Sequence, residues 1–174
     1  LLAFEQSLAQ CAVALHIFRA KSIPLISQSL ALSYSSLTDK AEKADLLYAP
    51  DLSIESVEEY LQKLADERTR DRIMGSTRKG PHRDDFLFRL QKRDARTYAS
   101  EGQQRGLVLA LRLAEFTYLR QSLGRVPLIL ADDVLGELDN KRKANFRKLL
   151  PPEAQVFATG TAYPSEDESA IWET

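Results

Sequence analysis

Four consecutive apolar residues, 128–131, run directly into two adjacent aspartates, Asp132 and Asp133. An uninterrupted apolar run of this length is typical of a strand that is buried on both faces of a sheet. Open α/β sheets bind their ligands at the C-terminal ends of such strands. We therefore expect a buried strand over residues 128–131 that presents both carboxylates where a ligand would bind.

The segments around this strand follow an α/β order. Apolar residues at helical spacing predict a long helix over residues 101–123, which ends at Gly124 and is followed by Pro127. A second helix is expected over residues 140–150 and a second apolar strand over residues 155–158. Strand, helix and strand in this order indicate the α/β fold class.

The first third of the chain is predicted to be helical. Apolar residues recur there at three- and four-residue spacing, the pattern of a helix whose narrow stripe packs against another helix. The stripe consists of Leu1, Phe4, Leu8, Cys11, Leu15, Phe18 and Leu25. Pro24 should kink or restart this helix, and a further apolar stretch over residues 26–37 continues it.

A second helix is expected after a break at residues 48–51. Ser53 can cap this helix, and apolar residues from Ile54 to Leu64 would share one face. Two helices with a short connection suggest an antiparallel helical arm over residues 1–74. A plain two-helix piece of a bundle explains the same residues.

The pattern changes at Gly75, so we divide the chain into an arm at 1–74 and an α/β lobe at 75–174. Residues 86–90 alternate as in a partly buried strand, and 91–94 predict a hairpin turn with a return strand through Thr97 and Tyr98. The segment 80–85 reads GPHRDD. It is either a rigid turn in which Arg83 pairs with a carboxylate, or a surface for DNA or a second subunit.

The charge distribution bears on possible partners. Residues 68–96 hold ten basic and four acidic side chains, within a chain of net charge −1. Such a stretch can mark a nucleic-acid surface, although a solvated surface is the alternative. The candidates for phosphate contacts are Arg68, Arg70, Arg72, Arg78 and Lys79.

Composition indicates a compartment. No apolar run approaches the roughly 20 residues that span a bilayer. The single cysteine, Cys11, fits a reducing compartment such as the cytoplasm. The chain starts at Leu1, without methionine or a signal-peptide pattern, and the helical repeat already includes that residue. We therefore expect a fragment of a longer cytoplasmic protein.

The start of the long helix is a candidate phosphate site. Ser100 and Gln103 fit a capping box, which alone would explain both residues. Gly102 in the first turn costs about 1 kcal/mol relative to alanine, so it calls for another reason. A glycine there lets a phosphate approach the exposed amides of a helix N-terminus, and Ser100 could add a hydroxyl donor.

The two aspartates after the apolar strand suggest hydrolytic chemistry. In a nucleotide-hydrolysing enzyme, Asp132 would hold Mg²⁺, and Asp133 would orient and deprotonate the attacking water. The alternative is that both carboxylates cap the following loop and face solvent.

Together these segments resemble ABC ATPases. Residues 100–104 are similar to the signature motif, 128–133 to the Walker B strand and 136–139 to the D-loop. The runs GPHRDDF (80–86), ASEGQQRGLVLALRLAE (99–115) and DDVLGELD (132–139) resemble more narrowly the RecF family of DNA replication and repair proteins. The match is ordered across residues 75–161, and the helical segment before it is compatible with that family's arm.

This resemblance implies the C-terminal lobe of an ABC-type ATPase head, shared with SMC-like repair ATPases and preceded by a coiled-coil-like arm. Two heads would close face to face around two ATP molecules with Mg²⁺. Asp132 would be the magnesium-site carboxylate and Asp133 the catalytic carboxylate. The other implied nucleotide contacts are Ser100, Gly102 and Gln103 acting across the dimer, Asp139 in the D-loop, and Thr161 at the switch position.

The resemblance also implies partners and a cellular role. RecF-like proteins bind double-stranded or gapped DNA as ATP-bound homodimers and act with RecR and RecO to help load a recombinase at gaps. Recombinational repair, replication restart and the SOS response would be the processes served, without a membrane.

Three departures from the ABC pattern matter. The phosphate-binding motif G-x-x-x-x-G-K-[ST] does not occur in the sequence, so we expect the chain alone to be inactive. Asp133 stands where a glutamate is usual, and Thr161 where many relatives have a histidine. Both substitutions suit slow hydrolysis by the full-length protein.

Two other readings stay open. The chain could be a non-catalytic module that binds DNA or a protein such as RecR, or a lobe of another SMC-like ATPase. A membrane-transporter ATPase is disfavoured, because its nucleotide-binding domain would not be expected to carry the N-terminal heptad helix.

Overall fold

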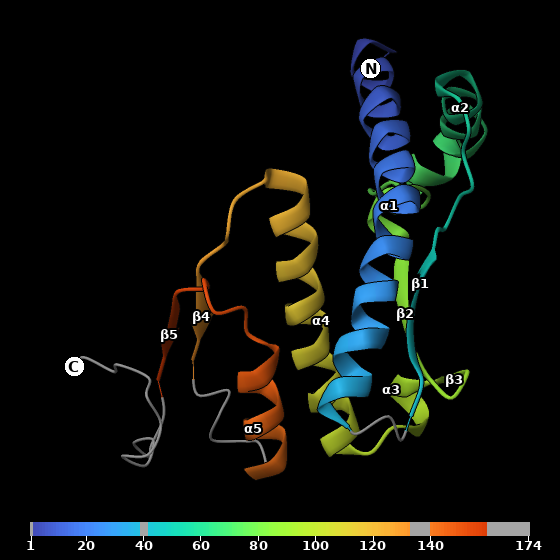
Figure 1. Ribbon diagram of the computed structural model, residues 1–174. Coiled ribbons are helices and arrows are strands. Elements are labelled where there is room, and N and C mark those ends of the chain that lie inside the picture. Colours follow the sequence, from blue (N-terminus) through green and yellow to red (C-terminus); the bar gives the residue numbers. More distant parts are fainter. Residues whose placement is uncertain (1, 39–41, 133–139, 160–174) are drawn as a thin grey trace. The chain divides into compact units, whose positions relative to one another are not determined.

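A computed structural model describes residues 2–38, 42–132 and 140–159 (Figure 1). It divides into two compact units that meet within one helix, between Tyr118 and Leu119. No helix among the described residues has the length and apolar character needed to cross a bilayer.

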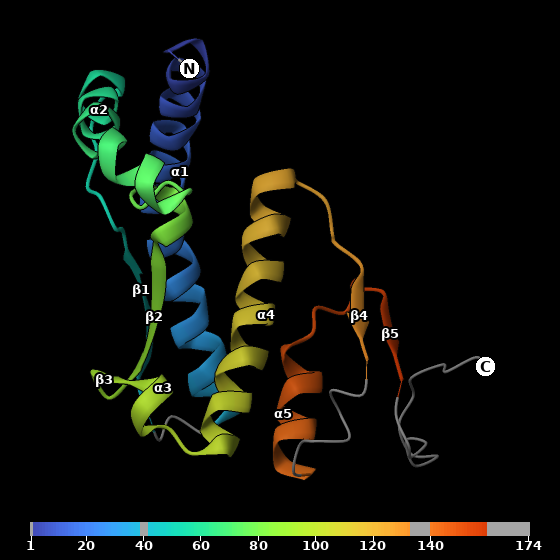
Figure 2. The ribbon, with the colours of Figure 1, turned by 180° about the vertical axis from the view of Figure 1, so that it is seen from behind.

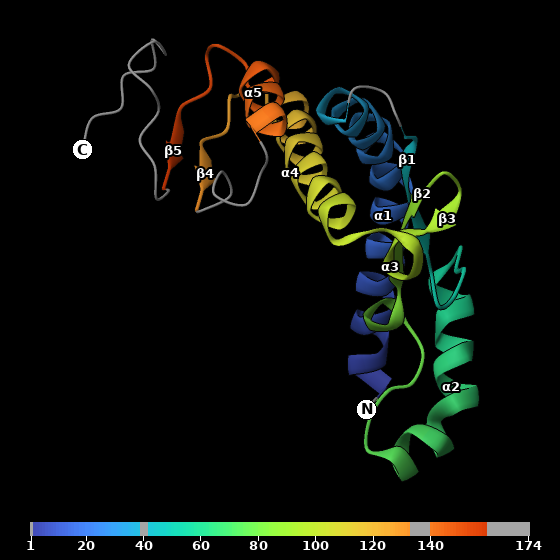
Figure 3. The same ribbon diagram turned by 90° about the horizontal axis from the view of Figure 1, so that it is seen from below.

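The first unit is built on α1 (Leu2–Leu37), a helix of 36 residues that continues through Pro24 without a restart. Helix α2 (Val57–Met74) lies beside the N-terminal half of α1. A three-stranded sheet also runs alongside α1 (Figures 2 and 3). The sheet has the order β1 (Ala44–Ala49), β2 (Asp85–Leu90), β3 (Arg93–Asp94). The 3₁₀ turn η1 (Pro81–Arg83) precedes β2, and α3 (Ala95–Tyr98) follows β3.

The apolar stripe predicted on α1 does not form its packing face. Phe4, Phe18 and Leu25 are 81%, 59% and 53% exposed, whereas Ala9 and Ala12 are buried. Ala9, Ala12 and Val13 of α1 form one buried cluster with Ile54, which precedes α2, and with Tyr60 and Leu64 of α2. Small side chains on α1 leave room for the large ring of Tyr60, so size complementarity rather than heptad spacing selects the face. Leu1 lies outside the described residues.

The two helices of the predicted arm are joined through a strand, not through a short connection. β1 pairs antiparallel with β2, with Ala44 opposite Leu90 and Ala49 opposite Asp85. No helix covers the predicted break at 48–51, but its first two residues belong to β1 and the first helix already ends at Leu37. This pairing also joins residues on both sides of position 74, although the predicted domain division itself stays a prediction.

Helix α2 begins later than expected. Its N-cap is Ser56, not Ser53, and the Ser56 hydroxyl accepts a hydrogen bond from the Glu59 amide at 3.1 Å. The Glu59 carboxylate in turn accepts from the Glu55 amide at 3.2 Å. This reciprocal capping satisfies two amides at once, which a cap at Ser53 would not do. Gly75 ends the helix in the left-handed conformation, with φ of 68°.

The hairpin after β2 turns where predicted, but its return strand is short. Gln91 and Lys92 have φ of 50° and 65°, values typical of tight hairpin turns. The predicted strand through Thr97 and Tyr98 is instead the helix α3. Its cap is Asp94, whose carboxylate accepts from the Arg96 amide and the Thr97 hydroxyl at 3.0 and 3.1 Å.

Helix α4 (Glu101–Leu123) confirms the predicted long helix and enters the second unit at Leu119. There, β4 (Ile129–Ala131), α5 (Asn140–Leu149) and β5 (Val156–Ala158) confirm the predicted strand–helix–strand order. The strands are parallel, with Ile129 opposite Val156. β4 is not buried on both faces, however: Ala131 is buried and Leu130 is 74% exposed. The described sheet has only two strands, which leave one face open.

Candidate nucleotide-binding site

The start of α4 carries the predicted capping box. The Gln103 side-chain oxygen accepts from the Ser100 amide at 2.7 Å, and the Ser100 hydroxyl accepts from the Gln103 amide at 3.3 Å. Because the hydroxyl oxygen is the acceptor in this bond, its own proton stays available for another acceptor. Ser100, Glu101 and Gly102 are exposed, so a phosphate can reach this turn from solvent.

The same turn has the electrostatics of an anion site. The aligned peptides of α4 place partial positive charge at its N-terminus, and the first-turn amides point out of the helix. Arg105 lies one turn further and pairs with Glu101 at 2.7 Å. A phosphate near Ser100 would therefore meet a hydroxyl and helix amides, while the Arg105 guanidinium is balanced by Glu101.

A side chain that sequence reasoning missed, Glu42, braces this turn. Its carboxylate accepts from the Gln103 side-chain nitrogen and, at 2.9 Å, from the hydroxyl of the buried Tyr34 on α1. Glu42 is 61 residues from Gln103 in the chain. No local pattern marks such a residue, because only the fold brings the two together.

In the second unit, Asp132 lies directly after β4, as predicted. One of its oxygens accepts from the Thr159 hydroxyl at 2.5 Å, and the Thr159 amide donates to the Ala131 carbonyl at 3.0 Å. Thr159 follows the neighbouring parallel strand β5, so the two strand ends meet at one sheet edge. Thr159 was not predicted as a site residue. Its position directly after the second apolar strand could have indicated it, because that strand end lies beside the end of β4.

This carboxylate is suited to a hard cation such as Mg²⁺, which favours oxygen ligands and keeps several waters. Among the described residues, no group of three or more His, Cys, Asp or Glu side chains forms a metal site. A magnesium ion bound at Asp132 would take further ligands from phosphate and water, as Mg²⁺ commonly does in nucleotide sites. The predicted residues Asp133, Asp139 and Thr161 lie outside the described residues.

The GPHRDD segment is a fixed turn whose centre is Asp84. The Asp84 side chain is 3% exposed and pairs with Arg19 on α1 at 2.7 Å. It also accepts from the Tyr48 hydroxyl at 2.5 Å and the Asp51 amide at 3.0 Å. Burial, with the hydrogen bond to Asp84, raises the pKa of Tyr48 to about 12. Arg19, not Arg83, therefore forms the ion pair of this turn, and Arg83 is exposed.

A second carboxylate fixes the other end of this turn. Asp51 accepts from Lys79 at 3.0 Å and from the Gly80 amide at 3.1 Å. Burial acts to raise the pKa of Asp51, but these hydrogen bonds outweigh it and hold the pKa below its ordinary value. Gly80 has φ of 132°, and a Cβ there would lie 2.2 Å from the Tyr60 hydroxyl. The turn therefore requires glycine at this position.

The predicted DNA-contacting residues differ in their surroundings. Arg68, Arg70 and Lys79 form ion pairs with Glu5 at 2.7 Å, Glu67 at 3.6 Å and Asp51 at 3.0 Å. Arg72 and Arg78 are exposed, as is Arg83. Arg70 is itself 70% exposed in a loose pair, so Arg70, Arg72 and Arg78 stay accessible to a phosphate, whereas Arg68 and Lys79 are held by closer pairs.

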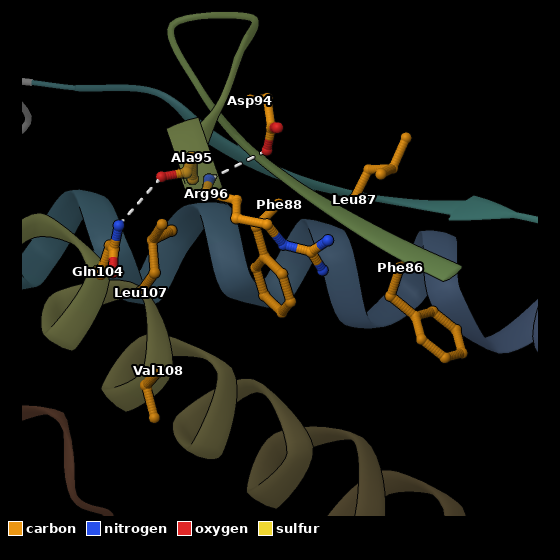
Figure 4. Close-up of a pocket in the computed structure, with 9 residues that line it drawn as sticks. All are labelled: Phe86, Leu87, Phe88, Asp94, Ala95, Arg96, Gln104, Leu107 and Val108. Atoms are coloured by element: carbon orange, nitrogen blue, oxygen red, sulfur yellow. Dashed lines mark hydrogen bonds between the residues drawn. The ribbon is translucent and has the colours of Figure 1, made fainter. Parts of the chain in front are cut away.

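A separate pocket of about 170 Å³ opens beside α4 (Figure 4). Its lining is mainly apolar and contains none of the predicted site residues. The lining residues are Phe86, Leu87, Phe88, Asp94, Ala95, Arg96, Gln104, Leu107 and Val108. Gln104 reaches across to the Ala95 carbonyl at 3.4 Å, as Figure 4 shows. This bond ties α4 to α3 next to the capping box.

The fold is that of an ABC-type ATPase lobe preceded by a helical arm. It is similar to a solved structure of the recombination mediator protein RecF with ATP in the RecFOR pathway, with a TM-score of 0.78 and 28% identity over 95% of this chain and 45% of that one. A second RecF structure, with ATPrS, gives a TM-score of 0.76 and 27% identity over 92% of this chain and 44% of that one.

The sequence relatives name the family. The chain is 37% identical to the DNA replication and repair protein RecF of Bacillus pumilus, over 99% of this chain and 44% of the relative. It is 41% identical to that of Moorella thermoacetica, over 78% of this chain and 36% of the relative. No protein-family model matches. The predicted resemblance is confirmed: the chain is similar to the C-terminal part of RecF proteins and spans less than half of their length.

Proposed function

We propose that this chain is part of a RecF-like, ATP-dependent DNA clamp for recombinational repair and replication restart. The observation that carries the proposal is the exposed start of α4, where the Ser100 hydroxyl accepts from the Gln103 amide and keeps its own proton available beside the exposed Gly102. Support comes from the similar RecF structures with ATP and ATPrS. The chain would supply one lobe of each head in an ATP-sandwiched homodimer.

In this proposal the residues have distinct tasks. Asp132, oriented by Thr159, would hold the Mg²⁺ that accompanies ATP. Asp133 would accept a proton from the water that attacks the γ-phosphate, with ADP leaving on the opposite side. Ser100, Gly102 and Gln103 would cap the γ-phosphate bound to the other subunit, while Asp139 and Thr161 would contact the nucleotide from the D-loop and the switch.

The proposal includes partners and a slow rate. DNA, double-stranded or gapped, would bind the closed dimer with Arg72 and Arg78 among its phosphate contacts, and RecR and RecO would act with it to load a recombinase. An aspartate base at 133 and a neutral threonine at 161 suit a timer, so turnover should stay below about 10 s⁻¹, an ordinary enzyme rate.

The test is ATP hydrolysis in the presence of DNA by the complete protein that carries this chain, with Asp133→Asn as the comparison. Slow turnover that the substitution abolishes, while ATP binding survives, is the expected result. A folded protein with neither turnover nor ATP binding would refute the proposal. That result would favour a DNA- or partner-binding module, to which the exposed Arg72, Arg78 and Arg83 would be suited.

A further inference from the structure

The turn at the start of α4 that holds Ser100, Gly102 and Gln103 is called the signature turn here, and α1 the arm helix. A chain of side-chain hydrogen bonds connects the two. The hydroxyl of Tyr34 on α1 donates to Glu42, which accepts from the Gln103 side-chain nitrogen. The oxygen of the same amide accepts from the Ser100 backbone. The connection thus runs from a fully buried ring on α1 to the residue proposed to contact the γ-phosphate.

Glu42 decides the orientation of the Gln103 amide. With the carboxylate in place, the amide nitrogen faces Glu42 and the amide oxygen faces the Ser100 N–H group. A flipped amide would direct its nitrogen at that N–H group and its oxygen at the carboxylate, so both contacts would become repulsive. Without Glu42 one of the two contacts that fix the amide is lost, and the acceptor of the Ser100 N–H group is held less firmly.

Helix α4 is tied to α1 at a second point. Ser22, buried on α1, shares a hydrogen bond with the Tyr118 hydroxyl at 2.9 Å. Two separate ties between the same helices transmit a shift or rotation of one to the other, because packed helices resist independent movement. Of the two, only the tie at Glu42 acts directly on the signature turn.

We infer that Glu42 is a positioning residue that couples the arm helix α1 to the signature turn of α4. This inference rests on the proposed ATP-sandwiched clamp, and it adds a regulatory route to it: movement of the arm would alter how Ser100 meets the nucleotide of the other subunit. Glu42 itself would not contact ATP.

The test uses the complete protein carrying Glu42→Ala, with Glu42→Gln as the conservative variant. The glutamine can offer its oxygen to Gln103 and its nitrogen to the Tyr34 hydroxyl, so it keeps both contacts and removes only the charge. Glu115→Ala is the matched control, since it removes an exposed pair with Arg112 on the same helix, far from the signature turn. Dimerisation is followed by sedimentation velocity with ATPγS and Mg²⁺, and ATP binding is measured separately at protein concentrations where the protein is monomeric.

The expected result for Glu42→Ala is a dimer dissociation constant about tenfold higher and turnover about tenfold lower, because a signature-turn contact worth one hydrogen bond is misplaced. Monomer ATP affinity should not change, and the melting temperature should fall by a few degrees, because the buried Tyr34 hydroxyl loses the Glu42 acceptor. Glu42→Gln and Glu115→Ala should stay within about twofold of the parent, within the usual range for surface substitutions.

Other outcomes separate the two proposals. Parent-like dimerisation by Glu42→Ala would overturn the coupling and leave the clamp standing. A parent protein that does not dimerise with ATPγS would overturn both. If Glu42→Ala fails to fold, Tyr34→Phe takes its place, because it deletes one hydroxyl and keeps the buried ring. It should weaken dimerisation in the same direction by a smaller factor, and an unchanged dimer would refute the coupling.

Discussion

The two candidate regions, the turn at Ser100 and the strand end at Asp132, are held very differently within their own units. The signature turn at Ser100 is braced within the first unit by hydrogen bonds that reach Gln103, Glu42 and Tyr34. Asp132, in the second unit, is oriented by Thr159 at the edge of a two-stranded parallel pair with an exposed apolar face. The contrast indicates that side chains of the first unit preorganise the signature turn through a network, whereas the contact that orients Asp132 is the Thr159 hydroxyl at an exposed sheet edge.

The largest effect is expected at Asp132. In the complete protein, Asp132→Asn should lower ATP turnover by at least about a hundredfold, because it removes the charge that balances the metal. The free energy of unfolding should change by less than about 0.5 kcal/mol, since the side chain is exposed. Steady-state kinetics and urea unfolding measure the two quantities. Glu153→Gln, which alters a surface pair with Arg120 in the same unit, is the control and should leave both near the parent.

Asp84 should show the opposite behaviour, a loss of stability. Asp84→Ala leaves Arg19 without its partner and takes an acceptor from Tyr48 and from the Asp51 amide. Breaking a fully buried pair costs about 3–5 kcal/mol. Arg19 is 24% exposed, so we expect about 3 kcal/mol here. Chemical unfolding of the chain measures it.

The neighbouring residue supplies the matched control for Asp84. Asp85→Ala removes a carboxylate that is 52% exposed and lies 3.8 Å from Arg96. Exposed pairs at this distance contribute about 0–1 kcal/mol. Equal destabilisation by the two substitutions would contradict a special role for Asp84 in the GPHRDD turn.

Gly80→Ala comes next in size. The substitution combines a left-handed φ of 132° with a contact 2.2 Å from the Tyr60 hydroxyl, so we expect a loss of about 2 kcal/mol. Gly75→Ala is the comparison, because φ there is 68° and nothing lies within 4 Å of the added methyl group. It should cost about 1 kcal/mol. A larger loss at Gly75 than at Gly80, measured by thermal unfolding, would show that the Tyr60 contact relaxes freely.

Sequence reasoning succeeded where the structure is local. The helix α4, its capping box and the strand–helix–strand order of the second unit depend on residues close together in the chain, so their patterns predicted them. The signature, Walker B and D-loop motifs also led to the correct family. They gave no information on which side chains hold Ser100 or Asp132 in place.

Long-range pairs explain most of the failures. Asp84 pairs with Arg19, which is 65 residues away in the chain. The strand β1 was not predicted, because it is defined by its pairing with the distant strand β2. The heptad stripe on α1 failed for another reason: spacing reports an apolar face but not which face α2 covers. The covered face is the one that carries the small residues Ala9 and Ala12, which pack in one cluster with the large ring of Tyr60. Tyr60 is far along the chain, so the local spacing on α1 does not reveal it.

In the second unit, substitutions at Thr159 test whether its hydroxyl orients Asp132. Thr159→Val keeps the shape and removes the hydroxyl that orients Asp132, so turnover should fall by about tenfold at limiting Mg²⁺, the lower end of outer-shell effects on metal sites. Thr159→Ser keeps the hydroxyl and should restore most of the loss. The half-saturating Mg²⁺ concentration for ATP turnover measures the effect. An unchanged Mg²⁺ requirement in the valine variant would mean that Asp132 is oriented by other groups in the complete head.

The smallest expected effect is a pH dependence of the first unit. Burial and the hydrogen bond to Asp84 raise the pKa of Tyr48 to about 12, from 10.0. Between these values the unfolded chain releases the phenol proton while the folded chain keeps it, so the folded state loses stability as the pH rises. Below pH 10 the contribution of Tyr48 is fully present. Unfolding of the parent between pH 9 and 12 is compared with Tyr48→Phe, because lysines and other tyrosines also titrate there. The parent should lose more stability across this range than the phenylalanine variant, and equal slopes would show that the phenol does not stay protonated beside Asp84.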